Sequence, residues 1–283
     1  MTTNTITRFA PSPTGRLHLG HAWSALQAHD LARARGGRFL LRIEDIDRTR
    51  CKPEFVEGIF EDLHWLGLGW DGDVMTQSER MAIYAQAIDK MQEMGLLYRC
   101  TCTRADIAGA ASAPQGAMGT VYPGTCRHAA IDAGTALPWS WRLDMAKAVA
   151  MTGPLSWQDS RAGKIAAMPE ILGDVVLARK DAGTSYHLSV TIDDAAQAIT
   201  DVVRGRDLFE ATHIHRLLQA ILGLPTPLYH HHALLTGSDG DRLAKRKASP
   251  TIASLRESGA DPAALVAAMR NGVFPIGFAL EQA

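Results

Sequence analysis

The sequence predicts an α/β fold with a parallel sheet, because its first part follows the order strand, loop, helix, strand. A short strand over residues 6–10 ends at two prolines and a glycine, which exclude regular structure over residues 11–15. Apolar residues then recur at helical spacing over residues 18–35, and a buried strand follows over residues 39–43. Ligands of such units bind at the carboxyl ends of the strands, where the loop over residues 11–15 lies.

Two further helices are predicted before the pattern changes. Pro53 suits the first turn of one helix, and Ser78 can cap another that stops at Gly95. Between residues 100 and 138 the periodicity fails, and Gly, Ala, Ser and Pro dominate. We therefore expect an insertion with little core of its own.

The second half of the chain predicts a return to the sheet. Residues 174–178 and 200–204 have the composition of strands, and the alanine-rich stretch over residues 251–270 predicts a short helical C-terminal region. We therefore expect four segments. They are a first half of the sheet domain (1–98), the insertion (99–170), a second half of the sheet domain (171–235), and a basic loop with the helical region (236–283).

Composition excludes several classes of protein. The chain has 283 residues, a formal charge of -1, 46% hydrophobic residues and 21% charged residues, so a disordered tail, a collagen-like fibre and a highly basic coat protein are excluded. No window approaches the roughly 18 continuous apolar residues of a membrane span, and the start does not resemble a signal peptide. A cytoplasmic monomer that does not bind membranes is expected.

Two stretches of the sequence match known ligand-binding motifs but lack the structural context that these motifs require. Residues 67–72 fit the dinucleotide fingerprint as a string, but a helix precedes them and none clearly follows, so a turn between two helices is predicted. His230, His231 and His232 suggest a metal tract. Adjacent residues of a strand point to opposite faces, however, so a strand next to the active cleft is favoured.

Two histidines, His18 and His21, lie three residues apart on the same side of the first turn of the first predicted helix. Gly15 and Gly20 remove side chains where a nucleotide would approach the backbone, and the free N–H groups of a helix start favour phosphate. Taken alone, the pair is equally compatible with capping or surface histidines.

A basic segment over residues 242–247 lies between Gly237 and Ser249. By itself it is typical of a solvated basic face or a weak phosphate patch. Opposite a helix N-terminus, however, a loop lysine such as Lys245 can neutralise charge that develops on a phosphate during displacement.

These motifs occur in blocks that together resemble the opening of the glutamyl-tRNA synthetases. The likeness covers most of residues 6–249, and its first block is highly specific for that family. The matching blocks are residues 8–15, 18–21, 42–47, 65–71, 186–190, 193–194 and 203–205.

The resemblance implies a class I synthetase with a Rossmann-like, nucleotide-binding parallel sheet. Residues 18–21 stand at the HIGH signature and residues 242–246 at the KMSKS signature, and both bind ATP in that family. Arg242 and Ala244 depart from the commoner Lys-Leu-Ser-Lys-Arg form, whereas Lys245 is retained. The implied catalytic residues are His18, His21 and Lys245. The implied ATP-binding residues are His18, Gly20, His21, Arg242, Leu243 and Lys245.

Glutamate carries two carboxylates and one ammonium group, so its complement is two cations and one anion. Arg8, Arg204 and Glu44 form such a set, and the planar fork of arginine can bind both oxygens of a carboxylate. The sequence leaves open which arginine meets which carboxylate. The residues that the resemblance implies around the amino acid are Arg8, Phe9, Ala10, Pro11, Ser12, Glu44, Tyr186 and Arg204.

Three of the four cysteines, Cys100, Cys102 and Cys126, cluster in the predicted insertion. In a reducing compartment such a cluster indicates metal binding or catalysis, and three thiolates with a fourth ligand can make a closed, structural zinc site. Tyr122 and His128 compete for the fourth place. Free cysteines packed as small hydrophobic residues are the alternative.

Fewer than forty residues follow the KMSKS-like segment, too few for the anticodon-binding region of a synthetase that charges tRNA Glu. This short end and the cysteines resemble the glutamyl-queuosine tRNA(Asp) synthetase family, in which the side chains corresponding to Cys100, Cys102, Tyr122 and Cys126 hold one structural zinc. The likeness implies that L-glutamate is activated with ATP and magnesium and transferred to queuosine in tRNA Asp.

Three other functions remain open at this point. The first is a minimal synthetase that charges the 3′ end of tRNA Glu. The second is a non-catalytic regulator that binds glutamate or its adenylate. The third is a zinc-held RNA-binding module, which would not need the glutamate-binding set.

Overall fold

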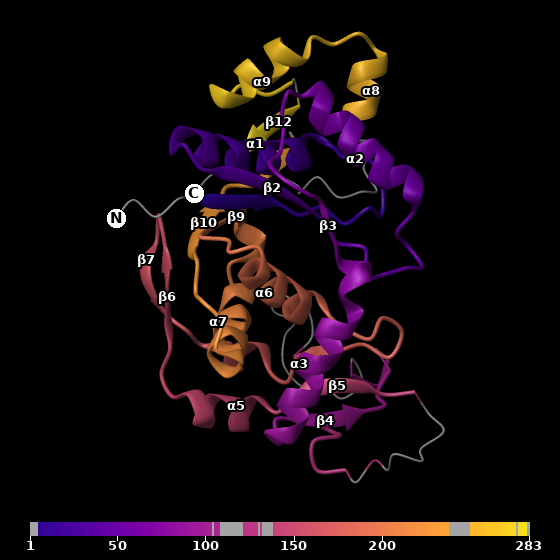
Figure 1. The fold of residues 1–283 in the computed structure, drawn as a ribbon, viewed down its shortest axis with the longest axis vertical. Helices are drawn as coiled ribbons and strands as arrows, with labels where there is room; N and C mark the ends of the chain where they lie inside the picture. The colour runs from indigo at the N-terminus through magenta and orange to yellow at the C-terminus, as the bar shows by residue number, and fades with distance from the viewer. Residues whose placement is uncertain are drawn as a thin grey trace. The chain divides into compact units, whose positions relative to one another are not determined.

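The computed structural model has a parallel sheet at the start of the chain, as the sequence predicts (Figure 1). β1 (Ile6–Phe9) pairs in parallel with β2 (Arg38–Ile43), which pairs in parallel with β3 (Met75–Thr76). Later in the chain, β9 (Asp201–Gly205) pairs in parallel with β10 (Leu228–His232). The structure describes residues 5–103, 105–107, 121–129, 131, 138–237, 250–275 and 277–281.

The β9–β10 pair lies beside β1. The N–H of Thr200 donates to the carbonyl of Ile6 at 3.0 Å, and Nη1 of Arg8 donates to the carbonyl of Val203 at 3.3 Å. The partners advance together along both segments, so β9 runs parallel to β1. The carboxyl ends of β1, β2 and β9 therefore lie at one edge of this part of the fold, where an α/β protein builds its ligand site.

The chain folds into two compact units, each made of separate segments. The first comprises Met1–Ser78, Ile199–Asp207 and Pro227–Ala283, and the second comprises Glu79–Ala198 and Leu208–Thr226. The predicted division into four segments stays a prediction. The first unit also contains α1 (Leu19–Ala34), α2 (Pro53–Trp65), β11 (Leu235–Gly237), α8 (Ile252–Glu257), α9 (Pro262–Arg270) and β12 (Phe278–Leu280).

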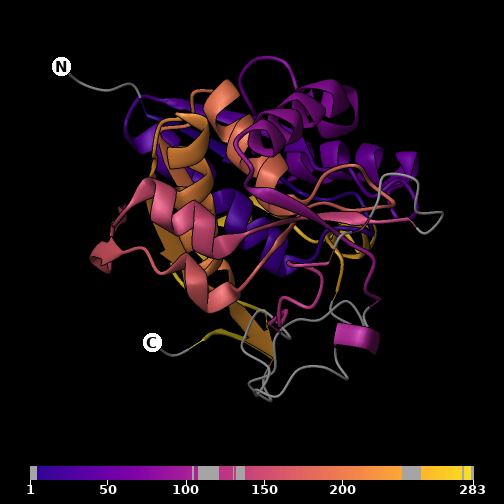
Figure 2. The same ribbon diagram turned by 90° about the horizontal axis from the view of Figure 1, so that it is seen from below.

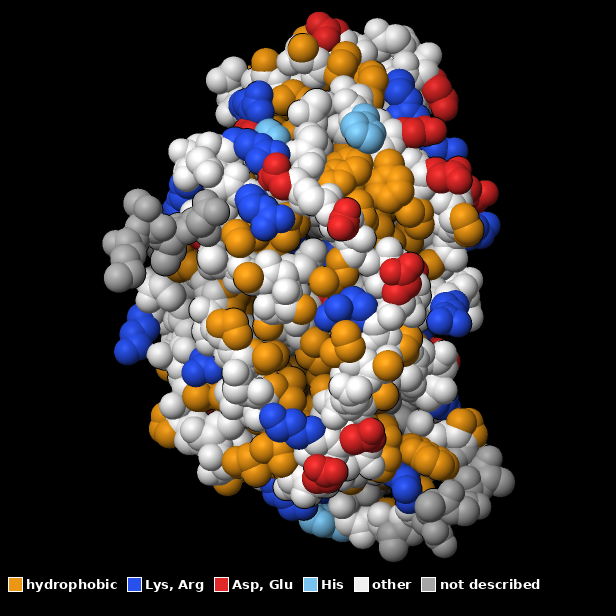
Figure 3. Space-filling view, in the orientation of Figure 1, with side chains coloured by type: hydrophobic (Ala, Val, Ile, Leu, Met, Phe, Trp, Pro, Cys, Tyr) orange, Lys and Arg blue, Asp and Glu red, His pale blue; other side chains and the backbone are white. Residues whose placement is uncertain are grey.

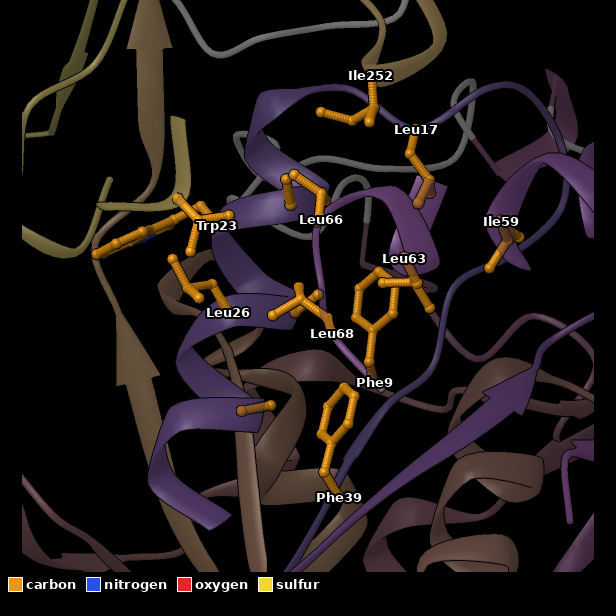
Figure 4. Packing of buried hydrophobic residues seen from close by; sticks show 14 of the residues in the cluster. Phe9, Leu17, Trp23, Leu26, Phe39, Ile59, Leu63, Leu66, Leu68 and Ile252 are labelled. Carbon is orange, nitrogen blue, oxygen red and sulfur yellow. The ribbon is translucent and has the colours of Figure 1, made fainter. Parts of the chain in front are cut away.

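A hydrophobic core between the strands and helices of the first unit fixes where α1 begins. Trp23 and Leu26 of α1 and Leu63 of α2 pack in one cluster with Phe9 of β1 and Phe39 of β2 (Figure 4). Burying a side chain of this size stabilises a fold by roughly 1.5–3 kcal/mol. The start of α1 is thereby held at the carboxyl edge of the strands.

The third predicted helix begins later than expected. A 3-10 turn, η1 (Gln77–Arg80), follows β3, and α3 (Met81–Glu93) starts after it, so the prediction that Ser78 caps the helix is wrong. The N–H of Ser78 instead donates to Oδ1 of Asp45 at 2.8 Å. Residues 67–72 do lie in the connection after α2, with a turn at Leu66 and Gly67, but β3 and η1 intervene before α3.

The second unit contains an antiparallel sheet that the sequence did not predict. Its strands are ordered β4-β5-β8, and β4 runs antiparallel to β5. Figure 1 labels β4 and β5, and Figure 2 shows the same chain turned by 90°. Residues 174–178 were expected to resume the parallel sheet, but β8 pairs antiparallel with β5, so only the strand over residues 200–204 does so. The unit contains β4 (Leu97–Cys100), β5 (Ser140–Leu143), α5 (Met145–Thr152), β6 (Ser156–Asp159), β7 (Gly163–Ala166), η2 (Pro169–Leu172), β8 (Val176–Ala178), α6 (Tyr186–Ala196) and α7 (Ala211–Leu222).

The C-terminal region is helical, as predicted, but residues 251–270 form two helices rather than one. α8 ends before Gly259, whose φ of +78° favours glycine, and α9 begins at Pro262 with Asp261 as its N-cap. After α9, β12 pairs antiparallel with β11. None of the helices that the structure describes is long and apolar enough to cross a bilayer.

Candidate active site

The two histidines of residues 18–21 cap α1 and each other. His18 is the N-cap, and its Nδ1 accepts the N–H of Gly20 at 3.1 Å, while Nδ1 of His21 accepts the N–H of His18 at 3.1 Å. The ring centroids are 3.8 Å apart. Because both Nδ1 atoms accept, each neutral ring carries its proton on Nε2. Two imidazole donors are therefore fixed side by side at a helix N-terminus, which favours an anion.

A pocket of about 420 Å³ opens at this helix start, within the first unit. A β-carbon at Gly205 would lie 2.6 Å from both Asp207 Oδ1 and Leu234 Cδ2, so a larger residue requires both side chains to move. The volume falls in the range of small-ligand sites, about 300–1,000 Å³. Its lining includes His18, Gly20, His21, Ser24, Gly205 and His232.

The KMSKS-like residues Arg242, Leu243 and Lys245 lie outside the described residues, but both flanks of their segment reach this pocket. On one side, Leu235 at the start of β11 lines the pocket. On the other side, Thr251 forms a β-bridge with His18. The chain thus enters and leaves the segment over residues 238–249 close to the α1 start.

Four charged side chains are buried where β1, β2 and β9 end: Arg8, Arg42, Glu44 and Arg204. Nη2 of Arg42 lies 3.1 Å from Oε1 of Glu44, and these side chains are 0% and 8% exposed. Buried charges cost several kcal/mol each unless they are compensated. Glu44 therefore compensates Arg42, and Arg8 and Arg204 add two further buried cations where these strands end.

Arg204 is held by two aromatic neighbours from β10. Its Nε donates to Nε2 of His231 at 3.2 Å, and its guanidinium carbon lies 5.3 Å from the ring centroid of Tyr229. The rings of Tyr229 and His231 are themselves stacked, with centroids 5.9 Å apart. The imidazole and the phenol ring therefore fix the direction in which this guanidinium points.

The three consecutive histidines lie on β10, as predicted for a strand next to the cleft, and each has a different partner. His230 contacts Asp201 at 2.7 Å, His232 contacts Oγ of Ser24 at 3.1 Å, and His231 contacts Arg204. Among the described residues they form no group able to hold a metal ion. The alternation of faces along a strand explains the difference.

The remaining residues predicted around glutamate lie in different parts of the fold. The side chain of Phe9 packs in the core, and the carbonyl of Pro11 accepts the N–H of Glu44 at 3.0 Å. Tyr186 is the first residue of α6, in the second unit, and Ser185 caps that helix. Ala10 and Ser12 lie in the loop after β1.

The predicted metal ligands are brought together in the second unit. The Sγ atoms of Cys100, Cys102 and Cys126 lie within 4.8 Å of one another, and no other described histidine, cysteine or acidic residues form such a group. The hydroxyl of Tyr122 lies 3.4 Å from Cys100 Sγ and 3.6 Å from Cys102 Sγ, whereas His128 is exposed. Tetrahedral zinc with bonds of about 2.3 Å separates its sulfur ligands by roughly 3.8 Å, so the geometry fits.

Hydrogen bonding changes the acidity of these thiols. Burial raises the pKa of Cys102 to about 11. Burial acts in the same direction on Cys126, but hydrogen bonds with Tyr122 and Cys102 lower its pKa to about 7. A thiolate is the form that binds metal, so Cys126 is a favourable ligand.

Comparison with known proteins places the chain in a family. Residues 4–279 match the model of the catalytic domain of class I tRNA synthetases (E and Q). A glutamyl-Q tRNA(Asp) synthetase of Rhodobacter capsulatus is 54% identical over 91% of this chain and 97% of the relative. The chain belongs to the glutamyl-Q tRNA(Asp) synthetase family.

Other members and more distant structures agree with this assignment. A glutamyl-Q tRNA(Asp) synthetase of Symbiobacterium thermophilum is 42% identical over 92% of this chain and 83% of the relative. The structure of a glutamate tRNA ligase from Elizabethkingia meningosepticum, in complex with its amino acid, matches with a TM-score of 0.75 at 27% identity. That match covers 94% of this chain and 60% of the ligase.

Sequence reasoning did not assign the roles that the structure gives to three residues of this chain: Arg42, His231 and Arg142. Arg42 pairs with Glu44, and His231 holds Arg204. The guanidinium carbon of Arg142 lies 3.7 Å from the ring centroid of Tyr122, so this buried arginine covers the ring. A charged residue inside an otherwise apolar strand is the signal that could have found Arg42.

Proposed function

We propose that the protein activates L-glutamate with ATP and transfers the glutamyl group to queuosine in the anticodon loop of tRNA Asp. The observation that supports activation is the buried set of Arg8, Arg204 and Glu44 close to the nucleotide-sized pocket. Gly205, which lines that pocket, directly follows Arg204 in β9. The queuosine acceptor rests on the name and high identity of the relatives.

In the first step, an oxygen of the glutamate α-carboxylate attacks the α-phosphorus of ATP, and pyrophosphate leaves. The Nε2–H donors of His18 and His21 and the positive end of the α1 helix dipole stabilise the negative charge that develops on the phosphates. Lys245 adds a cation from the KMSKS-like segment. Magnesium accompanies the ATP and neutralises phosphate charge. No protein nucleophile is needed.

In the second step, a hydroxyl oxygen of the queuosine diol attacks the carbonyl carbon of glutamyl-adenylate. The carbon–oxygen bond to the phosphate breaks, AMP leaves, and the hydroxyl proton is released. Arg8 and Arg204 hold the glutamyl carboxylates during this step, and Glu44 holds its ammonium group. These residues therefore contribute to catalysis mainly by orienting the glutamyl group for attack.

The thiol cluster has a structural role in this proposal. Cys100, Cys102, Cys126 and Tyr122 would hold one zinc ion, which closes a tetrahedral site and leaves no position for a substrate. The phenol rather than His128 is the fourth ligand, because its oxygen lies among the sulfur atoms. Close by, Arg127 pairs with the buried Asp174 at 2.7 Å and ties this segment to the residues before β8.

Incorporation of labelled glutamate into bulk tRNA tests the acceptor. The tRNA is taken from cells that make queuosine and from cells that cannot, and the label is mapped with nucleases. Label in the anticodon fragment of tRNA Asp that disappears without queuosine supports the proposal. Label at the 3′ end would identify a minimal glutamyl-tRNA synthetase, and absence of label would favour a regulator that binds glutamate.

Lys245→Ala is expected to lower glutamate-dependent ATP–pyrophosphate exchange by roughly 10²–10³-fold, because it removes a charge that stabilises the transition state. The melting temperature should change little, since a lysine in a basic, polar stretch of sequence is expected to be solvated. Normal exchange in this variant would refute the role of Lys245.

His231→Leu is expected to raise the KM for glutamate about tenfold, because Arg204 Nε loses its buried acceptor. The KM for ATP should stay unchanged. His231→Gln offers an acceptor at a similar distance and should restore much of the affinity. His230→Leu, at the neighbouring position of the strand, is the matched control, and an equal effect there would disprove a specific role of His231.

A further inference from the structure

A second cavity of about 390 Å³ lies in the first unit, and none of the residues assigned above lines it. It is formed by the loop after β1, the segment between β2 and α2, and the start of η1. The residues that matter here are Pro13, Asp45, Arg48, Lys52 and Ser78. The first pocket already provides a place for the nucleotide, so this cavity is available to a different ligand.

The second cavity shares its wall with the glutamate-binding residues. The N–H of Glu44 donates to the carbonyl of Pro11 at 3.0 Å, and the N–H of Lys52 donates to the carbonyl of Pro13 at 3.1 Å. These bonds tie the loop after β1 to the segment after β2. Asp45, which lines the cavity, is the direct chain neighbour of Glu44. An occupant of the cavity thus borders the same loop and the same segment as the residues proposed to bind glutamate.

Two cations at this cavity are available to a ligand. Arg48 is exposed and makes no hydrogen bond or ion pair within the described part of the chain. Nζ of Lys52 lies 3.8 Å from Glu54 Oε1, and both side chains are more than half exposed, so this ion pair is weak. On the face shown in Figure 3, basic and acidic side chains are interspersed rather than gathered into one field. Arg48 and Lys52 therefore form a local pair of cations that can bind phosphate.

Asp45 offers a hydrogen-bond acceptor inside the same cavity. Its Oδ1 accepts the N–H of Ser78 at 2.8 Å, which orients the carboxylate. Its second oxygen has no partner among the residues that the structure describes. An ionised carboxylate only accepts hydrogen bonds, so it selects hydroxyl or N–H groups. α2 also begins here at Pro53 without a side-chain cap, and a helix start favours phosphate.

We propose that this cavity receives the RNA nucleoside that accepts the glutamyl group. Arg48 and Lys52 bind phosphates that flank the nucleoside, and the second oxygen of Asp45 accepts a hydrogen bond from one of its hydroxyls. This inference rests on the two-step function proposed above, because it needs a glutamyl-adenylate within reach of the cavity. It assigns the transfer step to residues that the activation step does not use.

The test measures the two steps separately in Arg48→Glu and Lys52→Glu variants. Activation is followed by glutamate-dependent ATP–pyrophosphate exchange, and transfer by labelling of tRNA from queuosine-making cells. Each variant should raise the KM for tRNA on the order of tenfold, and losing one phosphate contact should reduce the salt dependence of binding by about one unit of slope. Exchange should remain within about twofold of the unmodified enzyme.

Lys90→Glu and Arg161→Glu are the matched controls, since both residues are exposed cations of the second unit. An equal rise in KM for these controls would show that the effect is general charge repulsion, and the proposal would fail. Unchanged transfer in Arg48→Glu and Lys52→Glu, with normal exchange, would overturn the cavity assignment and leave the proposed function intact. Absence of glutamate-dependent ATP–pyrophosphate exchange in the wild-type enzyme would instead contradict the proposed function itself.

Two variants of Asp45 distinguish a role of this residue in binding the nucleoside from a role in the fold. Asp45→Asn keeps an oxygen for the N–H of Ser78 but replaces the second acceptor with an NH₂ donor. We expect the rate of transfer to fall at least tenfold while exchange and melting temperature stay close to their normal values. Asp45→Ala also removes the contact with Ser78. Normal transfer by Asp45→Asn, combined with a lower melting temperature of Asp45→Ala, would show that Asp45 serves the fold alone.

Discussion

Replacing Arg8 with glutamine is expected to raise the KM for glutamate in ATP–pyrophosphate exchange on the order of 10²–10³-fold. Arg8 is 6% exposed, so its guanidinium and the substrate carboxylate that it meets are both removed from water. Deleting one partner of such a buried pair costs roughly 3–5 kcal/mol, because the other charge stays buried and uncompensated. The KM for ATP should change much less, since the nucleotide pocket is lined by other residues.

The control for Arg8 is a surface arginine with a similar partner. Arg270 pairs with Asp30 at 2.8 Å and is 49% exposed, so Arg270→Gln should leave the KM for glutamate within about twofold of normal. Competition with L-glutamine then shows which carboxylate of glutamate Arg8 meets, because glutamine lacks the side-chain carboxylate. If Arg8 meets the side-chain carboxylate, Arg8→Gln will lose discrimination between glutamate and glutamine. A folded Arg8→Gln enzyme with normal KM would exclude Arg8 from the site.

The start of the fold was predictable because several local signals agree there. The two prolines after β1 exclude regular structure, His18 begins α1, and Gly36, with φ of +63°, ends it. The paired histidines were expected at the same side of one helical turn, and the structure places them there. Their mutual capping, however, depends on ring orientation, which sequence spacing does not determine.

The second unit was less predictable because its pairing is not local. β5 contacts both β4, some forty residues earlier, and β8, more than thirty residues later. Short strands of three or four residues carry too few alternating positions to show their direction or partner. The break between α8 and α9 could, in contrast, have been predicted from Gly259 and Pro262. It was not predicted because the alanine-rich composition suggested one continuous helical stretch.

In the candidate site, sequence motifs named the charged residues that we propose to meet substrate, but not the side chains that hold them. Arg42 and His231 act through Glu44 and Arg204, and these contacts arise only when β2, β9 and β10 come together. A motif records the residue types that chemistry needs at fixed spacing. Partners from other strands vary in spacing, so burial and hydrogen bonding in the structure are needed to find them.

Removing zinc from the thiol cluster is expected to unfold the segment around Cys100 and Cys126 while the first unit stays folded. Among the residues that the structure describes there, the hydrophobic cluster is small, with Cys100, Tyr122 and Cys126 as its buried members. Structural zinc sites in peptides contribute about 10–16 kcal/mol of apparent binding energy, far more than so small a core supplies. Purified protein should contain about one zinc per chain, and a chelator should expose the segment to limited proteolysis.

Ligand variants distinguish the metal from simple packing of the thiols. Cys126→Ser should abolish stoichiometric zinc binding, and Tyr122→Phe should weaken it on the order of tenfold or more, because three thiolates remain but the hydroxyl is lost. His128→Ala should bind normally, since this imidazole is exposed. Cobalt substitution gives a readout that does not depend on activity, because thiolate coordination produces characteristic absorption bands.

Protein that is stable, free of zinc and insensitive to chelators would show that the three cysteines pack as small hydrophobic residues. Weakened binding by His128→Ala but not by Tyr122→Phe would transfer the fourth position to the histidine.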